Sequence, residues 1–217
     1  MSVTPESVQA LLDSENFGDR IRGVNQMRDL DPAIAFPMAV KLATDSSVRV
    51  RYAAISQLSE LGKQDRDKSL QILSDRLAND PEIDVKAAAA DGLGALQLVE
   101  AYPQLAEAYH GTEEWLLQMS IVATLGELGD RRALTLLEAA LSSETELVRA
   151  SAVSALGELG LPEGVALLLP LVEDSDWQVR HRLAQALHAL GGDEVQAALE
   201  QLASDAVEAV AIAARPQ

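Results

Sequence analysis

The sequence predicts an all-α fold in which antiparallel helix pairs stack into an α-solenoid, a superhelix of repeated units. A short motif recurs about every 31 residues, and its apolar positions follow steps of three and four, which place them on one side of a helix. Hydrophobic residues make up 48% of the chain but aromatic residues only 3%, which favours thin helix-on-helix packing. Since one helix pair cannot bury its apolar stripe alone, neighbouring pairs must stack.

The repeat is defined by six copies of a motif that ends near an anchor leucine, spaced by 31, 35, 32, 31 and 31 residues. The anchors are Leu30, Leu61, Leu96, Leu128, Leu159 and Leu190. The long interval contains a charged loop at 62–68, where extra residues fit easily. We predict a single domain over 1–217, with repeats at 1–31, 32–62, 63–97, 98–129, 130–160 and 161–191 and a C-terminal cap at 192–217.

Each copy predicts two helices, a first (A) helix and a second (B) helix that ends near the anchor. The A helices are indicated by upstream apolar stretches such as 133–141 and 165–172. Two apolar rows on the B helices lie three and six positions before the anchors and predict the buried stripe. These rows are Met27, Leu58, Leu93, Leu125, Leu156 and Leu187, and Val24, Ile55, Ala90, Val122, Val153 and Ala184.

A charged pattern accompanies the apolar one. Asp45, Asp80 and Asp174 mark turns between A and B helices, where a carboxylate can cap the free N–H groups of the next helix. Ten positions before the anchors lie Arg20, Arg51, Lys86, Gln118, Arg149 and Arg180. This Asp…Val-Arg pattern resembles the HEAT-repeat family, in the short bacterial form called the bilin-lyase-type repeat. The resemblance implies an Asp–Arg ladder between repeats, which Thr112 and Gln118 are expected to break in the fourth copy.

Charge and composition exclude several functions. A net charge of −17 argues against nucleic acid and against an anionic membrane surface, because both need clustered Lys and Arg. The absence of cysteine excludes disulfides, thiolate catalysis and cysteine zinc sites. No apolar run has the length of a membrane span, and the N-terminal residues lack a basic region and an apolar signal core, so we expect no membrane insertion and a cytoplasmic location.

A closer resemblance extends over nearly the whole chain, in the stretches 4–8, 17–20, 48–57, 87–96 and 114–130. These stretches resemble cyanobacterial phycobilisome-degradation proteins of the bilin-lyase-like HEAT-repeat family. The resemblance implies binding to phycobiliproteins such as phycocyanin and allophycocyanin, no tightly bound cofactor, and a transient phycocyanobilin ligand. It also implies a location at thylakoid-associated phycobilisomes and a small degradation adaptor or a protease as further partner.

Three functional hypotheses stay open at this point. The protein assists bilin detachment during phycobilisome degradation, or it is a non-catalytic adaptor scaffold, or it is a subunit of a bilin-attaching lyase. Eliminating a cysteine thioether needs a base and an acid near the bond. Asp91, Glu127 and His181 are available for these roles, but the pattern assigns no catalytic residue.

The predicted binding groove is the side of the B helices opposite the packed stripe, at one, five and eight positions before the anchors. It is small and acidic in the middle, with an arginine at each end, and the family resemblance places it on the concave surface. The candidate residues are Arg22, Tyr52, Asp91, Met119, Ser120, Glu127, Ser151, Glu158, His181 and Arg182. Asp91 could accept pyrrole N–H bonds, and Arg22 or Arg182 could bind propionates. The competing interpretation is an acidic face that is merely solvated.

Aromatic and histidine residues complete the candidates. Trp115 and Trp177 occupy one row, thirteen before the anchors, where Phe17 also lies. We expect this row to pack the turn as a hydrophobic staple, with a stacking platform for a ligand as the alternative. His181 and His188 share a helix side without a third ligand nearby, so no metal site is expected.

Overall fold

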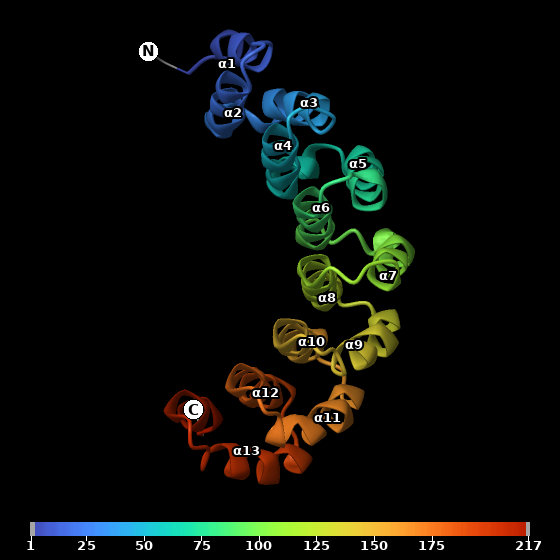
Figure 1. Ribbon diagram of the computed structural model, residues 1–217, viewed down its shortest axis with the longest axis vertical. Coiled ribbons are helices and arrows are strands. Elements are labelled where there is room, and N and C mark those ends of the chain that lie inside the picture. Colours follow the sequence, from blue (N-terminus) through green and yellow to red (C-terminus); the bar gives the residue numbers. More distant parts are fainter. Residues whose placement is uncertain (1–2, 216–217) are drawn as a thin grey trace. The chain divides into compact units, whose positions relative to one another are not determined.

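The computed structural model describes residues 3–215, and every regular element in this range is helical. The chain divides into two compact units, of which unit 1 ends at Thr112 and unit 2 begins at Glu113. The boundary lies inside the fourth predicted repeat, so the single domain over 1–217 stays a prediction. Helix pairs follow one another along each unit, as an α-solenoid requires (Figure 1).

Unit 1 contains three helix pairs and one further A helix. B helices α2, α4 and α6 form one layer, and A helices α3, α5 and α7 form the other (Figure 1). The helices are α1 (Pro5–Leu12), α2 (Phe17–Gln26), α3 (Pro32–Leu42), α4 (Val48–Leu61), α5 (Arg66–Asn79), α6 (Ile83–Ala95) and α7 (Tyr102–His110). Short 3-10 turns lie at η1 (Met27–Asp29), η2 (Gly62–Gln64) and η3 (Val99–Ala101).

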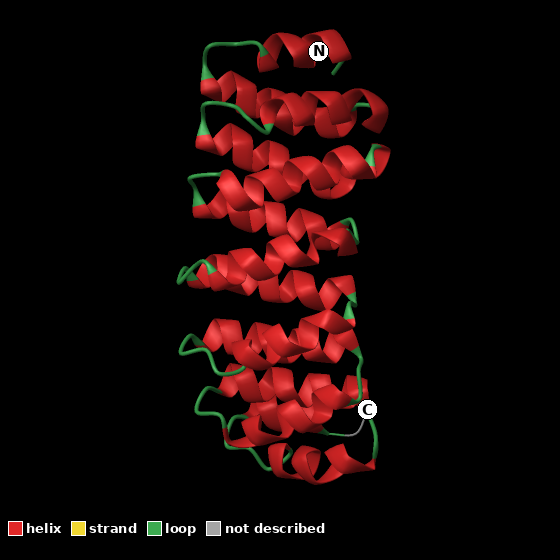
Figure 2. Cartoon of the chain, turned by 90° about the vertical axis from the view of Figure 1, so that its right-hand side faces the viewer, coloured by secondary structure: helices red, strands yellow, loops and turns green. Residues whose placement is uncertain are grey.

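Unit 2 repeats the same two layers. B helices α8, α10 and α12 line the inner side of a curve whose outer side is made by A helices α9, α11 and α13 (Figure 1). The helices are α8 (Trp115–Leu128), α9 (Leu134–Ala140), α10 (Glu146–Leu159), α11 (Glu163–Leu168), α12 (Trp177–Leu190), α13 (Gln196–Leu202) and α14 (Glu208–Ala214). The 3-10 turns are η4 (Arg131–Ala133), η5 (Leu169–Glu173) and η6 (Asp193–Val195). Neighbouring helices lie side by side with loops at both edges of the layers (Figure 2).

The predicted core is confirmed. All twelve residues of the two apolar rows, three and six before the anchors, are fully buried. The anchors are buried in the inner repeats, but Leu30 and Leu190 are only half-buried at the ends of the series. The second helix of the last pair, α14, has 7 residues where α8, α10 and α12 have 14, and the cap at 192–217 stays a prediction.

The Asp–Arg ladder forms in both units. The guanidinium of each ladder arginine binds the aspartate of the next repeat, and its Nη1 donates to a backbone carbonyl six residues before it. The pairs are Arg20–Asp45, Arg51–Asp80, Arg149–Asp174 and Arg180–Asp205. Lys86 instead donates to the Ala78 carbonyl at 3.1 Å. Asp205 was missed in the sequence, because it lies in the shortened cap beyond the last full motif.

The expected helix capping by the ladder aspartates is wrong. Asp45 and Asp80 each accept a backbone N–H from the residue two positions ahead, at 2.8 and 3.1 Å, which is an Asx turn that precedes the helix. Ser143 holds the same turn with its hydroxyl at 3.2 Å. Before α4 and α6, one aspartate side chain therefore both fixes the turn at the start of the B helix and binds the neighbouring repeat.

Neighbouring B helices in unit 2 touch backbone to backbone. A Cβ placed on Gly126 would lie 2.7 Å from Ala155 Cα, and one on Gly157 would lie 2.9 Å from Ala186 Cβ. These residues form two rows, two and four positions before the anchors, where only small side chains fit. Small residues on the B helices therefore serve helix packing first.

We expect Gly126→Ala to lower the free energy of unfolding by about 1 kcal/mol or more. Alanine raises helix propensity by about 1 kcal/mol, but forcing a methyl group into a packed contact costs about 1–3 kcal/mol. The control is Gly164→Ala in α11, whose Cβ would meet its nearest atoms at 3.8 Å and is expected to be neutral or slightly stabilising. Urea unfolding measures both, and equal effects at the two glycines would contradict the close contact of α8 and α10.

Candidate functional site

The B face of unit 2 holds most of the predicted groove residues, and the structure divides them into exposed and packed ones. We call the surface of the B helices at one, five and eight positions before the anchors the B face. Glu127, Glu158 and Arg182 are exposed on it, from α8, α10 and α12 respectively. Ser120 is only 7% exposed, and Ser151 donates its hydroxyl to the Met119 carbonyl across the α8–α10 contact at 3.3 Å. The small size of these two serines therefore has a packing reason, and Ser120 is not available to a ligand.

A shallow pocket of about 260 Å³ opens on the B face between α10 and α12. It brings together two predicted residues of opposite charge, Glu158 and Arg182. Its lining residues are Ser154, Gly157, Glu158, Arg182, Gln185, Ala186 and Ala189. The Arg182 guanidinium donates to Gln185 Oε1 at 3.3 Å, which holds it along α12. The close approach of α10 and α12 at Gly157 gives the pocket a small-residue floor with polar groups on its rim.

The predicted residues of unit 1 do not gather at one place. Arg22 pairs with Asp19 on the exposed side of α2, and Tyr52 is 47% exposed near the start of α4. Asp91 is exposed on α6. The pockets between α2 and α4 and between α3 and α5 are lined by none of these three residues.

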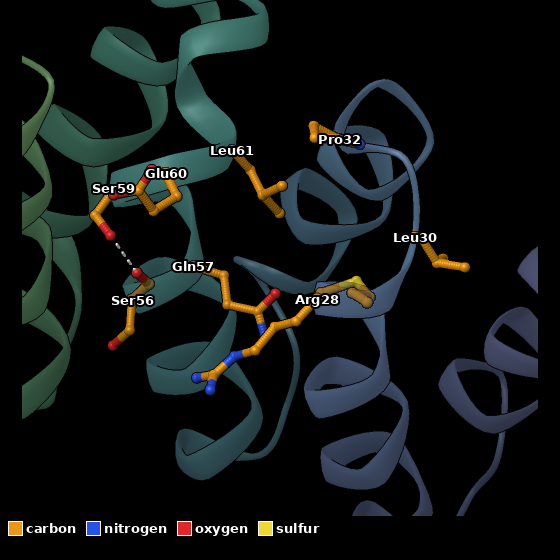
Figure 3. A pocket seen from close by; sticks show the side chains of 9 residues that line it. Arg28, Leu30, Pro32, Ser56, Gln57, Ser59, Glu60 and Leu61 are labelled. Atoms are coloured by element: carbon orange, nitrogen blue, oxygen red, sulfur yellow. Dashed lines mark hydrogen bonds between the residues drawn. The ribbon is translucent and has the colours of Figure 1, made fainter. Parts of the chain in front are cut away.

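A larger pocket of about 400 Å³ lies between α2 and α4 (Figure 3). Ser56 and Glu60 of the predicted rows line it, but none of the ten candidate residues does. Its residues are Met27, Arg28, Leu30, Pro32, Ser56, Gln57, Ser59, Glu60 and Leu61. Gln57 is 8% exposed and its Nε2 donates to the Val24 carbonyl at 2.5 Å. The signal that could have found this pocket is the long polar residue Gln57, at a B-helix position where the four later repeats carry Gly, Thr or Ala.

Two of the three residues available for thioether chemistry, Glu127 and His181, lie on B helices that are separated by α10. Asp91 belongs to unit 1, whereas Glu127 and His181 belong to unit 2. Within unit 2, α10 packs between α8, which carries Glu127, and α12, which carries His181. His181 lies against the Trp177 ring edge-on, with ring centroids 6.5 Å apart. Within residues 3–215 the structure contains no group of three His, Cys, Asp or Glu side chains arranged to hold a metal ion.

The carboxyls with a lowered pKa include Asp80, Asp174 and Asp205 of the ladder. Burial alone would raise the pKa of Asp80 and of Asp174, but the hydrogen bonds from Arg51 and Arg149 and from backbone N–H groups hold each pKa below its usual value. For Asp205 the hydrogen bonds from Arg180 are the main cause of the lowered pKa. These groups stay ionised and bound to arginine, so they act in stability.

The aromatic row is exposed, so the staple interpretation is wrong. Phe17, Trp115 and Trp177 are the first residues of α2, α8 and α12, and they stay 47%, 44% and 42% exposed. A staple requires the residue before the N-cap to pack against the fourth helical residue. Two positions further on, Leu117 and Val179 turn inward and are buried.

Comparison with known proteins identifies relatives of the fold. A family model described as HEAT repeats matches residues 4–94, 70–148 and 135–215. A chain in the structure of the complex of CpcE and CpcF of phycocyanin lyase from Nostoc sp. PCC7120 superposes with a TM-score of 0.66 at 23% identity, over 99% of this chain and 86% of that chain. The YibA protein of Escherichia coli superposes with a TM-score of 0.67 at 17% identity, over 97% of this chain and 80% of that chain.

No protein of curated function matches the sequence. At these identities the structural likeness establishes a shared fold. Among the described residues, no helix is both long and apolar enough to cross a bilayer.

Proposed function

Because this chain belongs to the HEAT-repeat family, we propose that it is a bilin-lyase-like scaffold whose B face in unit 2 binds a phycobiliprotein and contacts its bilin transiently during phycobilisome degradation. The fold is shared with a chain of the phycocyanin lyase complex, which supports the proposal but does not carry it alone. The proposed partners are phycocyanin and allophycocyanin, at thylakoid-associated phycobilisomes.

The observation that carries the proposal is the pocket between α10 and α12. Glu158 and Arg182 stand on the rim of a floor made by Gly157, Ala186 and Ala189. Small floor residues let another backbone or a ring approach closely, while an arginine can bind a carboxylate through two parallel hydrogen bonds. A bilin has groups that match both charged residues, because its propionates can bind Arg182 and its pyrrole N–H groups can donate to Glu158.

We expect Ala189→Trp to weaken phycocyanin binding by about tenfold or more, since the indole would fill the pocket rim and block close approach. Ala189 is exposed near the end of α12, so the substitution leaves the core intact. Binding of purified phycocyanin is measured by biolayer interferometry, and bilin absorbance of the captured phycocyanin shows whether the chromophore stays attached.

The matched control is Thr135→Trp, which adds the same bulk at an exposed position of A helix α9. This variant is expected to bind phycocyanin as the wild type does. Loss of binding by the control with full binding by Ala189→Trp would place the partner on the A helices instead. No binding of phycocyanin or allophycocyanin by the wild type would reject the proposed function.

A further inference from the structure

The pocket between α2 and α4 exists because one contact between B helices breaks the small-residue pattern. Gly126 faces Ala155 between α8 and α10, and Gly157 faces Ala186 between α10 and α12. In each pair, the glycine lies two positions before the anchor of its own helix, and the alanine lies four positions before the anchor of the next B helix. The same two positions between α2 and α4 hold Arg28 and Gln57. Two long polar side chains stand where glycine and alanine let the helices touch, and the pocket opens beside them.

The pocket has an apolar floor. Met27 is fully buried and Leu61 is 9% exposed, while Leu30 and Pro32 form the side toward the start of α3. Figure 3 shows the Leu30, Pro32 and Leu61 side chains on one side and the Ser56, Ser59 and Glu60 side chains on the other. A volume of about 400 Å³ lies within the range of small-molecule sites, about 300–1,000 Å³.

Gln57 presents a fixed acceptor to this space. Its Nε2 donates to the Val24 carbonyl, and because only the amide nitrogen can donate there, the orientation of the amide is determined. Its Oε1 accepts no hydrogen bond from residues 3–215. An amide oxygen that accepts no hydrogen bond from these residues can accept one from an N–H or O–H group of a ligand.

Arg28 supplies the positive charge of the pocket. It is exposed on the rim and forms no ion pair with any residue that the structure describes, whereas Arg22 of α2 pairs with Asp19 at 3.2 Å. The acidic residue of the pocket, Glu60, is bound to Lys63 at 2.8 Å. Figure 3 shows the Arg28 side chain running alongside Gln57, so its guanidinium and the Gln57 amide border the same space.

We propose that the pocket between α2 and α4 binds a small amphipathic carboxylate, with its carboxylate on Arg28, its apolar body on Met27, Leu30, Pro32 and Leu61, and a hydrogen-bond donor on Gln57 Oε1. Arginine binds a carboxylate through charge-assisted hydrogen bonds. Transfer of the ligand's apolar body from water to the apolar pocket floor is also favourable. The assignment lies in unit 1 and does not rest on the proposed function, which concerns the B face of unit 2.

The test uses 2-naphthoate as the probe, titrated into the purified full chain by isothermal calorimetry, with 2-naphthamide as the uncharged match. We expect naphthoate to bind at least about tenfold more tightly than naphthamide, and Arg28→Ala to remove that preference. Arg49→Ala is the matched control, because it removes an exposed arginine of α4 that lies outside the pocket, and naphthoate affinity is expected to stay unchanged.

A second probe tests the amide. We expect 6-hydroxy-2-naphthoate to bind the wild type more tightly than naphthoate, and Gln57→Leu to abolish this gain while circular dichroism shows a folded chain. Equal binding of naphthoate and naphthamide, no binding of either, or an undiminished naphthoate preference in Arg28→Ala would each overturn the proposal. Phycocyanin is absent from all these titrations, so a negative result would reject the carboxylate site without affecting the proposed function. Likewise, a chain that does not bind phycocyanin could still bind naphthoate.

Discussion

Replacing Asp80 with alanine is expected to lower the free energy of unfolding by about 3–5 kcal/mol, the cost of leaving a buried charge without its partner. The Asp80 side chain is fully buried and that of Arg51 is 9% exposed. Arg51 holds the carboxylate through Nε at 2.9 Å and Nη2 at 3.0 Å, and Arg76 approaches it at 3.4 Å. Removal of the carboxylate leaves two guanidinium groups beside a vacated space.

The control for this prediction is an exposed ion pair. Asp13 and Lys41 are 2.9 Å apart, with side chains 54% and 65% exposed. An exposed pair contributes about 0–1 kcal/mol, so Asp13→Ala is expected to change the free energy of unfolding by less than about 1 kcal/mol. Chemical denaturation measures both variants, and a loss at Asp80 no greater than at Asp13 would contradict the ladder as a stabilising contact.

The same pair predicts how stability changes with pH. The pKa of Asp80 is lowered in the folded chain, because the hydrogen bonds and charge of Arg51 outweigh the effect of burial. A lowered folded pKa means that the stabilisation is present above the ordinary carboxyl pKa and is lost as pH falls through the folded value. The difference between wild type and Asp80→Ala should therefore be full at pH 7 and shrink below about pH 4.

Leu125→Ala is expected to lower the free energy of unfolding by about 2–5 kcal/mol. Leu125 is fully buried in α8 and belongs to the row that is buried in all six repeats, so truncation leaves a cavity between α8 and its neighbours. The control is Leu147→Ala, also on a B helix of unit 2 but 37% exposed, for which we expect a loss below about 1 kcal/mol. Equal losses at the two leucines, measured by urea unfolding, would mean that this row does not form the core.

The fold could be predicted because its signals repeat. Rows such as Val153 and Leu156 recur at fixed distance from each anchor, and each copy confirms the others. The ladder followed from spacing too, except at Asp205, where the motif is shortened. Position along the chain says little about contacts between helices, however. Ser120 was expected on an open surface, but the close approach of α8 and α10 buries it.

The site was harder to predict than the fold, because it depends on departures from the repeat. Arg28 and Gln57 stand where the contacts of α8 with α10 and of α10 with α12 have glycine and alanine, but only the structure shows that these positions face each other across two helices. Glu158 and Arg182 were expected on one surface, and they do line one pocket.

Hydrogen exchange of the full chain with and without saturating phycocyanin tests the central claim most directly. We expect slower exchange of backbone amides in α10 and α12, which border the pocket of Glu158 and Arg182, and unchanged exchange in α9 and α11. Protection confined to the A helices α9 and α11, or no protection anywhere at saturating phycocyanin, would contradict binding by the B face.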